Sequence, residues 1–135
     1  MTSGYSGTPL AKKLSLEDGM RVWWDGMPDS VRKEIAAEGL QFQLLKAPQA
    51  PIDAAHIFVT ERADLDAKLQ ALLPLLDRAG FIWVSWSKKA SKIPTDITED
   101  VIRDVCLPMG LVDVKVCAVN ETWSGLKLTK RKAFR

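Results

Sequence analysis

Two segments of the chain combine cationic and aromatic side chains that would suit an anionic or nucleobase-like ligand. Residues 85–89 follow one apolar run, and residues 120–124 precede another. Lysines attract negative charge, and tryptophans stack on bases or face cations. The predicted ligand-binding residues are Trp86, Lys88, Lys89, Thr95, Asp96, Asn120, Glu121 and Trp123. The alternative is structural, with the two tryptophans packed at the edge of the core and the lysines solvated.

The other residues of reactive type point to no second site. His56 lies in an apolar run, so we expect a hydrogen-bonded core histidine. Cys106 and Cys117 also lie in apolar segments, where a thiol behaves as a small hydrophobe. The chain has no CxxC spacing, and its single histidine, His56, cannot complete a metal cluster. We therefore predict no disulfide and no structural zinc. No Ser or Cys stands in a nucleophile-elbow motif, so no catalytic or metal-binding residue is assigned.

The charged residues outside these segments are expected to be structural. Asp25 and Asp29 would make an acidic pair, but Asp29 also suits the first turn of a helix. Asp113 and Lys115 lie two residues apart on a strand, which predicts an exposed ion pair. The region after Lys115 is basic, which is typical of a solvated edge strand followed by a charged tail.

Alternating strand-like and helix-like segments must position these residues. Strands are predicted at Met20–Trp24, Gln41–Leu45, Ala54–Thr60, Phe81–Trp86, Leu111–Val119 and Leu126–Arg131. Helices are predicted at Pro9–Leu14 and from Pro28 to about Glu38. A third follows the leucine stripe from Leu65 to Leu76 and ends by Gly80. A fourth begins after a capping box formed by Asp96 and Glu99. In the fifth strand, alternation places Val112, Val114, Val116 and Ala118 on one face and Asp113, Lys115 and Cys117 on the other.

Strands that alternate with helices predict an α/β fold with a mostly parallel, six-stranded sheet and helices on both faces. The short connection before the last strand requires a C-terminal antiparallel hairpin. The 135 residues fit a single domain. Residues 1–8 are expected to form a flexible arm, in which Tyr5 would fold over the site, and residues 130–135 a basic tail.

This order of elements resembles the Rossmann-like class I methyltransferase fold, which ends in such a hairpin. The stretch "GLVDVKVCAVNETWSGLKLTKRK" looks like the hairpin, and "AGFIWVSWSKK" looks like the parallel strand beside it. The resemblance implies that the last strand lies next to the fourth one. The 85–89 and 120–124 segments would then be neighbours at the carboxyl edge of the sheet, where ligands bind in open α/β folds.

The first strand-to-helix turn lacks what a nucleotide-type cofactor needs. Such cofactors need glycines, so that backbone amides at a helix N-terminus can approach them. Here the turn contains one glycine, Gly26, followed by Met27, which would fill ligand space, and Pro28, which has no N–H. The end of the second strand, Leu45 to Pro48, has no carboxylate for ribose hydroxyls. We therefore predict no cofactor and no S-adenosylmethionine-dependent methyltransferase activity.

The amino-acid sequence also resembles a bacterial family known as domain of unknown function 3052. The matching stretches are "GYSGTPLAKKL" (Gly4–Leu14), "WVSWSKK" (Trp83–Lys89), "TDIT" (Thr95–Thr98) and "GLVDVKVCAVNETWSGLK" (Gly110–Lys127). They span nearly the whole chain. The resemblance implies one intact domain and supplies no mechanism.

Composition narrows the class of protein. With 47% hydrophobic and 27% charged residues, the chain can bury an ordinary core. A net charge of +2 argues against a general nucleic-acid binder. The chain has no long apolar run, which argues against a membrane span or a signal peptide. We therefore expect a cytosolic protein.

Three functional hypotheses follow from these observations. The first is a non-catalytic binding or regulatory domain with an unknown protein partner, because the five tryptophans suit a binding surface. The second is a small enzyme or metabolite-binding protein that holds an anionic ligand in the Lys/Trp crevice. The third is a subunit of a structural homodimer.

Overall fold

A six-stranded sheet forms the centre of the computed structural model, which describes residues 8–134. Its strands are β1 (Arg21–Asp25), β2 (Gln43–Leu44), β3 (Ile52–Val59), β4 (Leu76–Ser87), β5 (Leu111–Ala118) and β6 (Trp123–Lys130). Their order across the sheet is β2-β1-β3-β4-β6-β5. The first four strands pair in parallel, and β6 runs antiparallel to both β4 and β5. The predicted fold class and the predicted β4–β6 neighbourhood are confirmed.

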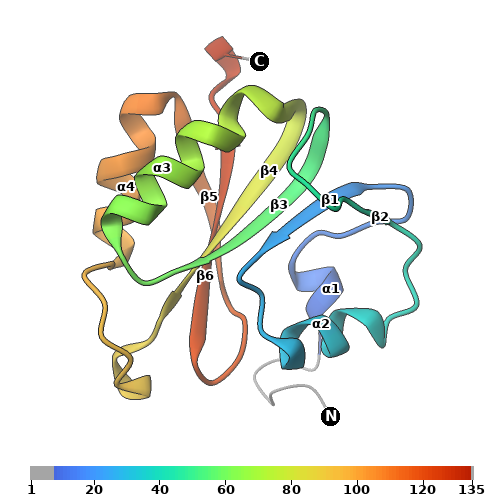
Figure 1. The fold of residues 1–135 in the computed structure, drawn as a ribbon, viewed down its shortest axis with the longest axis horizontal. Helices are drawn as coiled ribbons and strands as arrows, with labels where there is room; N and C mark the ends of the chain where they lie inside the picture. Colours follow the sequence, from blue (N-terminus) through green and yellow to red (C-terminus); the bar gives the residue numbers. More distant parts are fainter. Residues whose placement is uncertain (1–7, 135) are drawn as a thin grey trace.

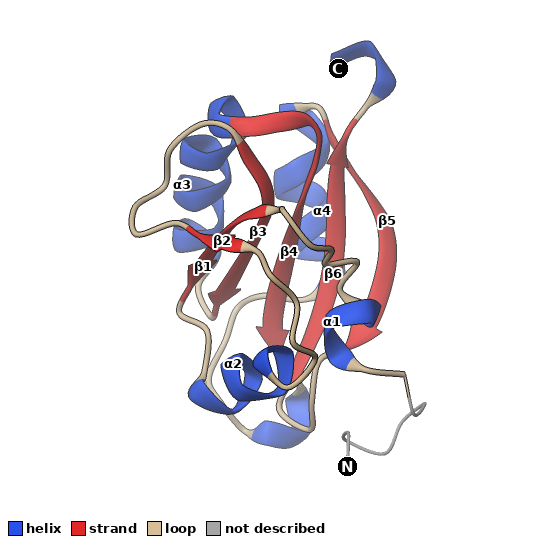
Figure 2. Cartoon of the chain, turned by 90° about the vertical axis from the view of Figure 1, so that its right-hand side faces the viewer, coloured by secondary structure: helices blue, strands red, loops and turns tan. Residues whose placement is uncertain are grey.

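Helices cover both faces of this sheet (Figures 1 and 2). On one face lie α3 (Arg62–Leu72) and α4 (Glu99–Cys106), and on the other lie α1 (Leu10–Lys13) and α2 (Asp29–Ala36). Each pair encloses its own hydrophobic cluster. The alternation of β3 explains the division, because Ala55, Ile57 and Val59 enter the α3/α4 core whereas Ala54 and Phe58 enter the α1/α2 core.

The predicted helical stripe ends earlier than expected, and β4 begins earlier. A single 3-10 turn, Leu73–Leu75, contains Pro74, and Leu76 already belongs to β4. Gly80 therefore lies inside the strand and does not end a helix. Its backbone runs so close to β3 that a Cβ there would lie 2.8 Å from the carbonyl oxygen of Ile52. The register between β3 and β4 shifts at this place, which is the irregularity that a strand glycine often marks.

The predicted faces of β5 are wrong beyond Asp113. A register shift between Asp113 and Lys115 interrupts the alternation, and Val114 and Val116 are 53% and 51% exposed. Cys117, expected on the solvated face, is buried instead. A β-bulge changes which residues face the core, and a sequence pattern of period two does not reveal it.

The predicted Asp113–Lys115 ion pair is replaced by a pair between elements. Asp113 accepts a 3.0 Å hydrogen bond from Nε of Arg103 on α4, and the same guanidinium contacts Glu99 and Asp100. Hydrogen bonds to Asp113 and Glu99 raise the pKa of Arg103. The network joins α4 to β5 across the sheet face that α4 covers.

The N-terminus of α4 is capped by Thr98 and not by the predicted Asp96. The Thr98 hydroxyl accepts a hydrogen bond from the backbone N–H of Val101 at 3.2 Å. The Asp96 carboxylate instead accepts a 2.7 Å hydrogen bond from the backbone N–H of Arg62, the first residue of α3. Both residues satisfy helix N-terminal donors, but they do so on two different helices.

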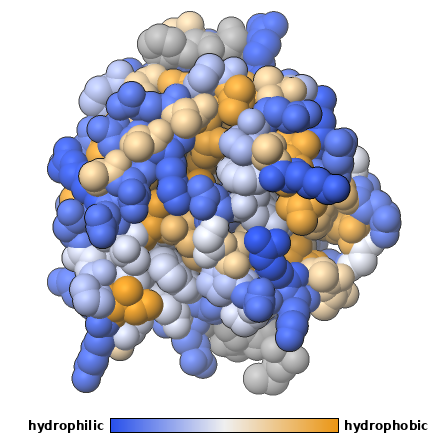
Figure 3. Space-filling model, in the orientation of Figure 1, coloured by the Kyte–Doolittle hydropathy of each residue, from blue (hydrophilic) through white to orange (hydrophobic). Residues whose placement is uncertain are grey.

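Both cysteine thiols are buried, as the sequence predicted, and among the described residues neither forms a disulfide. No helix within residues 8–134 has the length and apolarity that crossing a membrane requires. Figure 3 shows hydrophilic side chains spread over the viewed face, with smaller hydrophobic patches between them. The predicted arm lies outside the described residues apart from Thr8, and the end of the chain forms a 3-10 turn at Lys132–Phe134.

Candidate functional site

The turn between β1 and α2 stands at the carboxyl edge of the sheet, where a cofactor loop would be. Gly26 has a positive φ of 72°, and a Cβ on it would lie 3.3 Å from the carbonyl oxygen of Phe58. The Met27 side chain is buried in the α1/α2 core. Pro28 occupies the N-cap of α2 and donates no hydrogen bond. The turn therefore packs against its own sheet instead of presenting amides to a ligand.

The carboxylates near this turn serve other contacts. Asp25, at the end of β1, forms a 3.1 Å ion pair with Lys68 of α3. Asp29 is exposed in the first turn of α2, which is the helical role that the sequence predicted for it. Beyond β2, residues 45–50 contain no acidic side chain that would hold ribose hydroxyls. The residues at this edge do not fit an adenosyl cofactor bound in the usual way.

Beneath the turn, aromatic rings surround a buried histidine. His56 is fully buried, stacks on Phe58 with ring centroids 4.5 Å apart, and lies edge-on to Trp24. Its Nε2 shares a 2.6 Å hydrogen bond with the buried Ser85 hydroxyl. Burial lowers the pKa of His56 to about 3, so the imidazole is neutral at pH 7. The prediction of a hydrogen-bonded core histidine is confirmed.

The end of β4 and the β5–β6 turn meet as expected. The backbone N–H of Lys88 donates to the carbonyl of Thr122 at 2.8 Å, and its ammonium donates to the carbonyl of Asn120 at 2.7 Å. The Asn120 side chain accepts from the N–H groups of Thr122 and Trp123. These contacts fix the hairpin turn to the strand beside it, so Lys88 and Asn120 hold structure at the very place where ligand binding was predicted.

The structure does not bring the eight predicted residues into one crevice. Trp86 packs against the α3/α4 core, whereas Trp123 lies on the opposite face, 5.2 Å from the Phe58 ring in an edge-on arrangement. Thr95 donates to the carbonyl of Thr60, and Asp96 accepts from Arg62. Lys89 and Glu121 are exposed. The two tryptophans take the structural role that we gave as the alternative, and ligand binding by this set stays a prediction.

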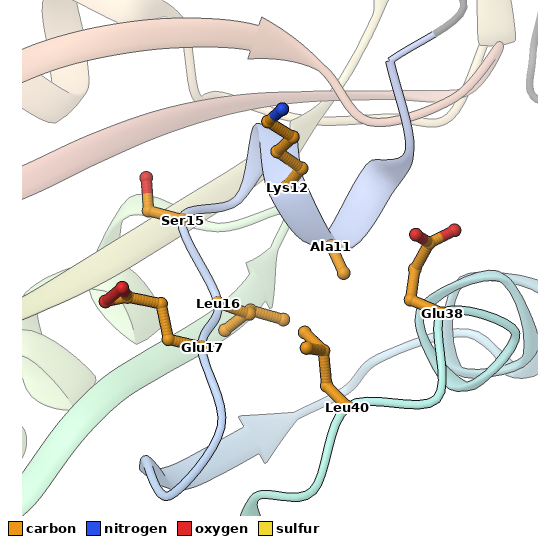
Figure 4. A pocket seen from close by; sticks show the side chains of 7 residues that line it. All are labelled: Ala11, Lys12, Ser15, Leu16, Glu17, Glu38 and Leu40. Atoms are coloured by element: carbon orange, nitrogen blue, oxygen red, sulfur yellow. The ribbon is translucent and has the colours of Figure 1, made fainter.

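A pocket that the sequence did not indicate lies between α1 and the segment after α2 (Figure 4). Its volume is about 480 Å³, within the range of small-molecule sites. Apolar and charged side chains mix around it: Ala11, Lys12, Ser15, Leu16, Glu17, Glu38 and Leu40. No motif could have identified this pocket, because residues from two distant segments form it. Across residues 8–134, no group of three or more His, Cys, Asp or Glu is placed to hold a metal ion.

Solved structures of methyltransferases share this fold. A putative type 11 methyltransferase from Sulfolobus solfataricus superposes with a TM-score of 0.59 and 13% identity, over 91% of this chain and 90% of that one. The ribosomal protein L11 methylase from Lactobacillus delbrueckii subsp. bulgaricus gives 0.57 at 12% identity, over 90% and 77%. LepI, in a complex with SAM, gives 0.55 at 11% identity, and the chain spans 47% of its length while 92% of the chain is covered.

These likenesses establish a class I methyltransferase-like fold. They show the fold alone, because identities this low carry no information on activity. No family model matches the chain, and no curated protein does.

Proposed function

We propose that this chain is a non-catalytic binding domain built on a methyltransferase-like sheet whose cofactor edge is closed. The observation that carries the proposal is the packing of the β1–α2 turn. Met27 is only 6% exposed, and the Gly26 backbone lies against β3. We infer that together they take up space that a cofactor would need at this turn. The two methyltransferases and LepI share this fold, and LepI was solved in a complex with SAM.

Two further features support binding without chemistry. The buried imidazole of His56 is neutral and enclosed by aromatic rings, so it has no access to a substrate proton. Burial raises the pKa of the Cys106 thiol to about 11 and also raises that of Cys117, so neither is an activated nucleophile at pH 7. The histidine and the two thiols thus serve the core of the protein, and none of the three is poised as an acid, base or nucleophile.

Metabolite binding is the second candidate function, and the pocket between α1 and the segment after α2 favours it. Its floor of Ala11, Leu16 and Leu40 suits an apolar group, and its rim of Lys12, Glu17 and Glu38 suits polar substituents. With the non-catalytic binding domain we also propose a cytosolic location, a protein partner and membership of the bacterial family known as domain of unknown function 3052. A homodimer stays a separate proposal. The sequence features that suggested them are given above.

A thermal-shift comparison tests the proposed function. The full chain is melted with S-adenosylmethionine or S-adenosylhomocysteine at about 1 mM, a concentration at which any ligand with a micromolar Kd raises Tm by several degrees. We expect no shift with either compound. The matched variant Met27→Gly removes the side chain that fills the turn, and a shift seen only with this variant would confirm that Met27 blocks the site. A shift with the unchanged chain would overturn the proposal.

A further inference from the structure

Three lysines from separate segments gather on the α1 side of the sheet. Lys115 on β5 and Lys127 on β6 are direct cross-strand partners, so their side chains leave the same face of the sheet. Lys13, at the end of α1, lies above them: the Lys115 ammonium is 3.5 Å from the Lys13 carbonyl oxygen. We call Lys13, Lys115 and Lys127 the lysine cluster.

The charges of the lysine cluster are not neutralised by the protein. None of the ion pairs found within residues 8–134 includes one of these lysines. Their ammonium groups instead approach uncharged oxygens, with Lys13 donating to the carbonyl of Ala118 at 2.8 Å and Lys127 to the hydroxyl of Ser15 at 3.0 Å. In Figure 4 the Ser15 side chain points away from the apolar floor of the pocket, on the side of the faint red strands.

Packing holds Lys127 in place despite the neighbouring charges. Its ammonium lies 4.5 Å from the centre of the Phe81 ring, in a cation–π contact, and the side chain is half-buried. Burial lowers the pKa of Lys127, and the charge of Lys115 lowers it further. Like charges placed directly opposite on two strands destabilise a sheet. Within residues 8–134, no carboxylate pairs with these lysines to relieve the repulsion between Lys115 and Lys127. An anion-binding site needs such uncompensated positive charge.

We propose that the lysine cluster and the Ser15 hydroxyl bind a small anion with at least two negative charges, of the phosphate or diphosphate type. The inference rests on the proposed binding function and adds the chemical class of the ligand. Ammonium groups bind phosphate as point charges from several directions, and three of them on one face of the sheet, with the Ser15 hydroxyl beside Lys127, suit a compact polyanion better than a single carboxylate. The lysine cluster contains none of the eight residues selected from the sequence.

Calorimetric titration with inorganic pyrophosphate, at fixed ionic strength, tests the inference. The variants are Lys115→Gln and Lys127→Gln, and the control is Lys33→Gln, because Lys33 is exposed on α2 outside the lysine cluster. We expect pyrophosphate to bind the unchanged chain and the control equally. Each cluster variant should lose about tenfold in affinity, as expected for one charge-assisted hydrogen bond. Lys115 is exposed, so its replacement does not depend on refilling the core.

A melting measurement without anion separates a binding role from a structural one. If the lysine cluster is a site, Lys115→Gln melts at the same temperature as the unchanged chain or higher, because the repulsion with Lys127 is gone. A lower Tm together with unchanged pyrophosphate affinity would mean that the lysines only pin α1 to the sheet, and this would overturn the inference. Absence of pyrophosphate binding, or tighter binding of a DNA oligomer than of pyrophosphate, would overturn it too. These results leave the proposed function standing, since only binding of S-adenosylmethionine contradicts that.

Discussion

The α-carbon of Gly26 lies so close to Phe58 that a Cβ on it would be 3.3 Å from the Phe58 carbonyl oxygen and 3.5 Å from the Phe58 Cβ. This approach joins the turn after β1 to the end of β3, the two places between which a cofactor would lie in a methyltransferase-like sheet. In this chain the glycine lets two parts of the backbone meet, which is the contact on which the proposed closure of this edge rests. The turn is therefore a packing element.

We expect Gly26→Ala to destabilise the protein more than Gly39→Ala does. Both glycines have nearly the same positive φ, 72° and 71°, so each substitution costs about 1–2 kcal/mol for the left-handed conformation. A Cβ at Gly39 would contact nothing within 4 Å, whereas at Gly26 it must displace the Phe58 backbone. The difference should be about 1 kcal/mol, read from urea unfolding curves. Equal losses would show that the turn is not packed against β3.

The free energy of unfolding should fall in mild acid because of His56. Its pKa is about 3 in the folded chain against 6.5 ordinarily, so below pH 6.5 the unfolded state binds a proton that the folded state does not. Stability is complete above pH 6.5 and is lost as the pH falls, by about 2 kcal/mol between pH 7 and pH 5. The chain has one histidine, so urea unfolding over this range isolates the effect.

His56→Gln is the control for this pH dependence, since glutamine keeps a hydrogen-bonding group and does not titrate. Its free energy of unfolding should be lower at pH 7 and nearly constant down to pH 5. A flat profile for the unchanged chain would mean that His56 takes up a proton in the folded state and is not enclosed as described.

Thr98→Ala should weaken the start of α4 by about 1 kcal/mol, as loss of an N-cap usually does. Asp96→Ala should leave α4 intact and loosen the start of α3, because its carboxylate accepts from Arg62. Hydrogen exchange measured by residue distinguishes the two, with faster exchange at Val101 in the first variant and at Arg62 in the second. Thr98→Ser, which keeps the hydroxyl, should exchange like the unchanged chain. Faster exchange at Glu99 in Asp96→Ala would restore the capping box that the sequence suggested, because an Asp96 cap would accept from the Glu99 N–H.

The sheet could be predicted from the sequence because its strands have a strong local signal. The apolar run from Ala54 to Val59 and the run from Phe81 to Trp86 need cover on both faces, which only the centre of a layered α/β fold supplies. The errors lie where a long-range contact decides. In the sequence Gly80 resembles a helix end, but its close approach to the Ile52 carbonyl places it inside β4. The bulge near Val114 depends on how β5 pairs with β6, which the sequence of β5 does not show.

The candidate site was harder to predict, because side chains expected together at one edge of the sheet lie on its two opposite faces. Trp86 and Trp123 both stand at strand ends, yet the register of β4 against β6 places them on opposite sides of the sheet. The lysine cluster shows the reverse case. Lys13 and Lys127 are far apart in the chain, and only the packing of α1 over β5 and β6 brings them together. The burial of Met27 and the place of Pro28 at the start of α2, in contrast, could be predicted, because both depend on local sequence.

Isothermal titration of S-adenosylmethionine into the full chain at about pH 7 tests the central claim most directly. The closed turn predicts no measurable heat of binding up to millimolar ligand, and Met27→Gly serves as the partner variant in which the space is reopened. Saturable binding to the unchanged chain, abolished by a bulky substitution such as Gly26→Leu, would contradict the account. It would show that the edge at Gly26 and Phe58 opens for the cofactor.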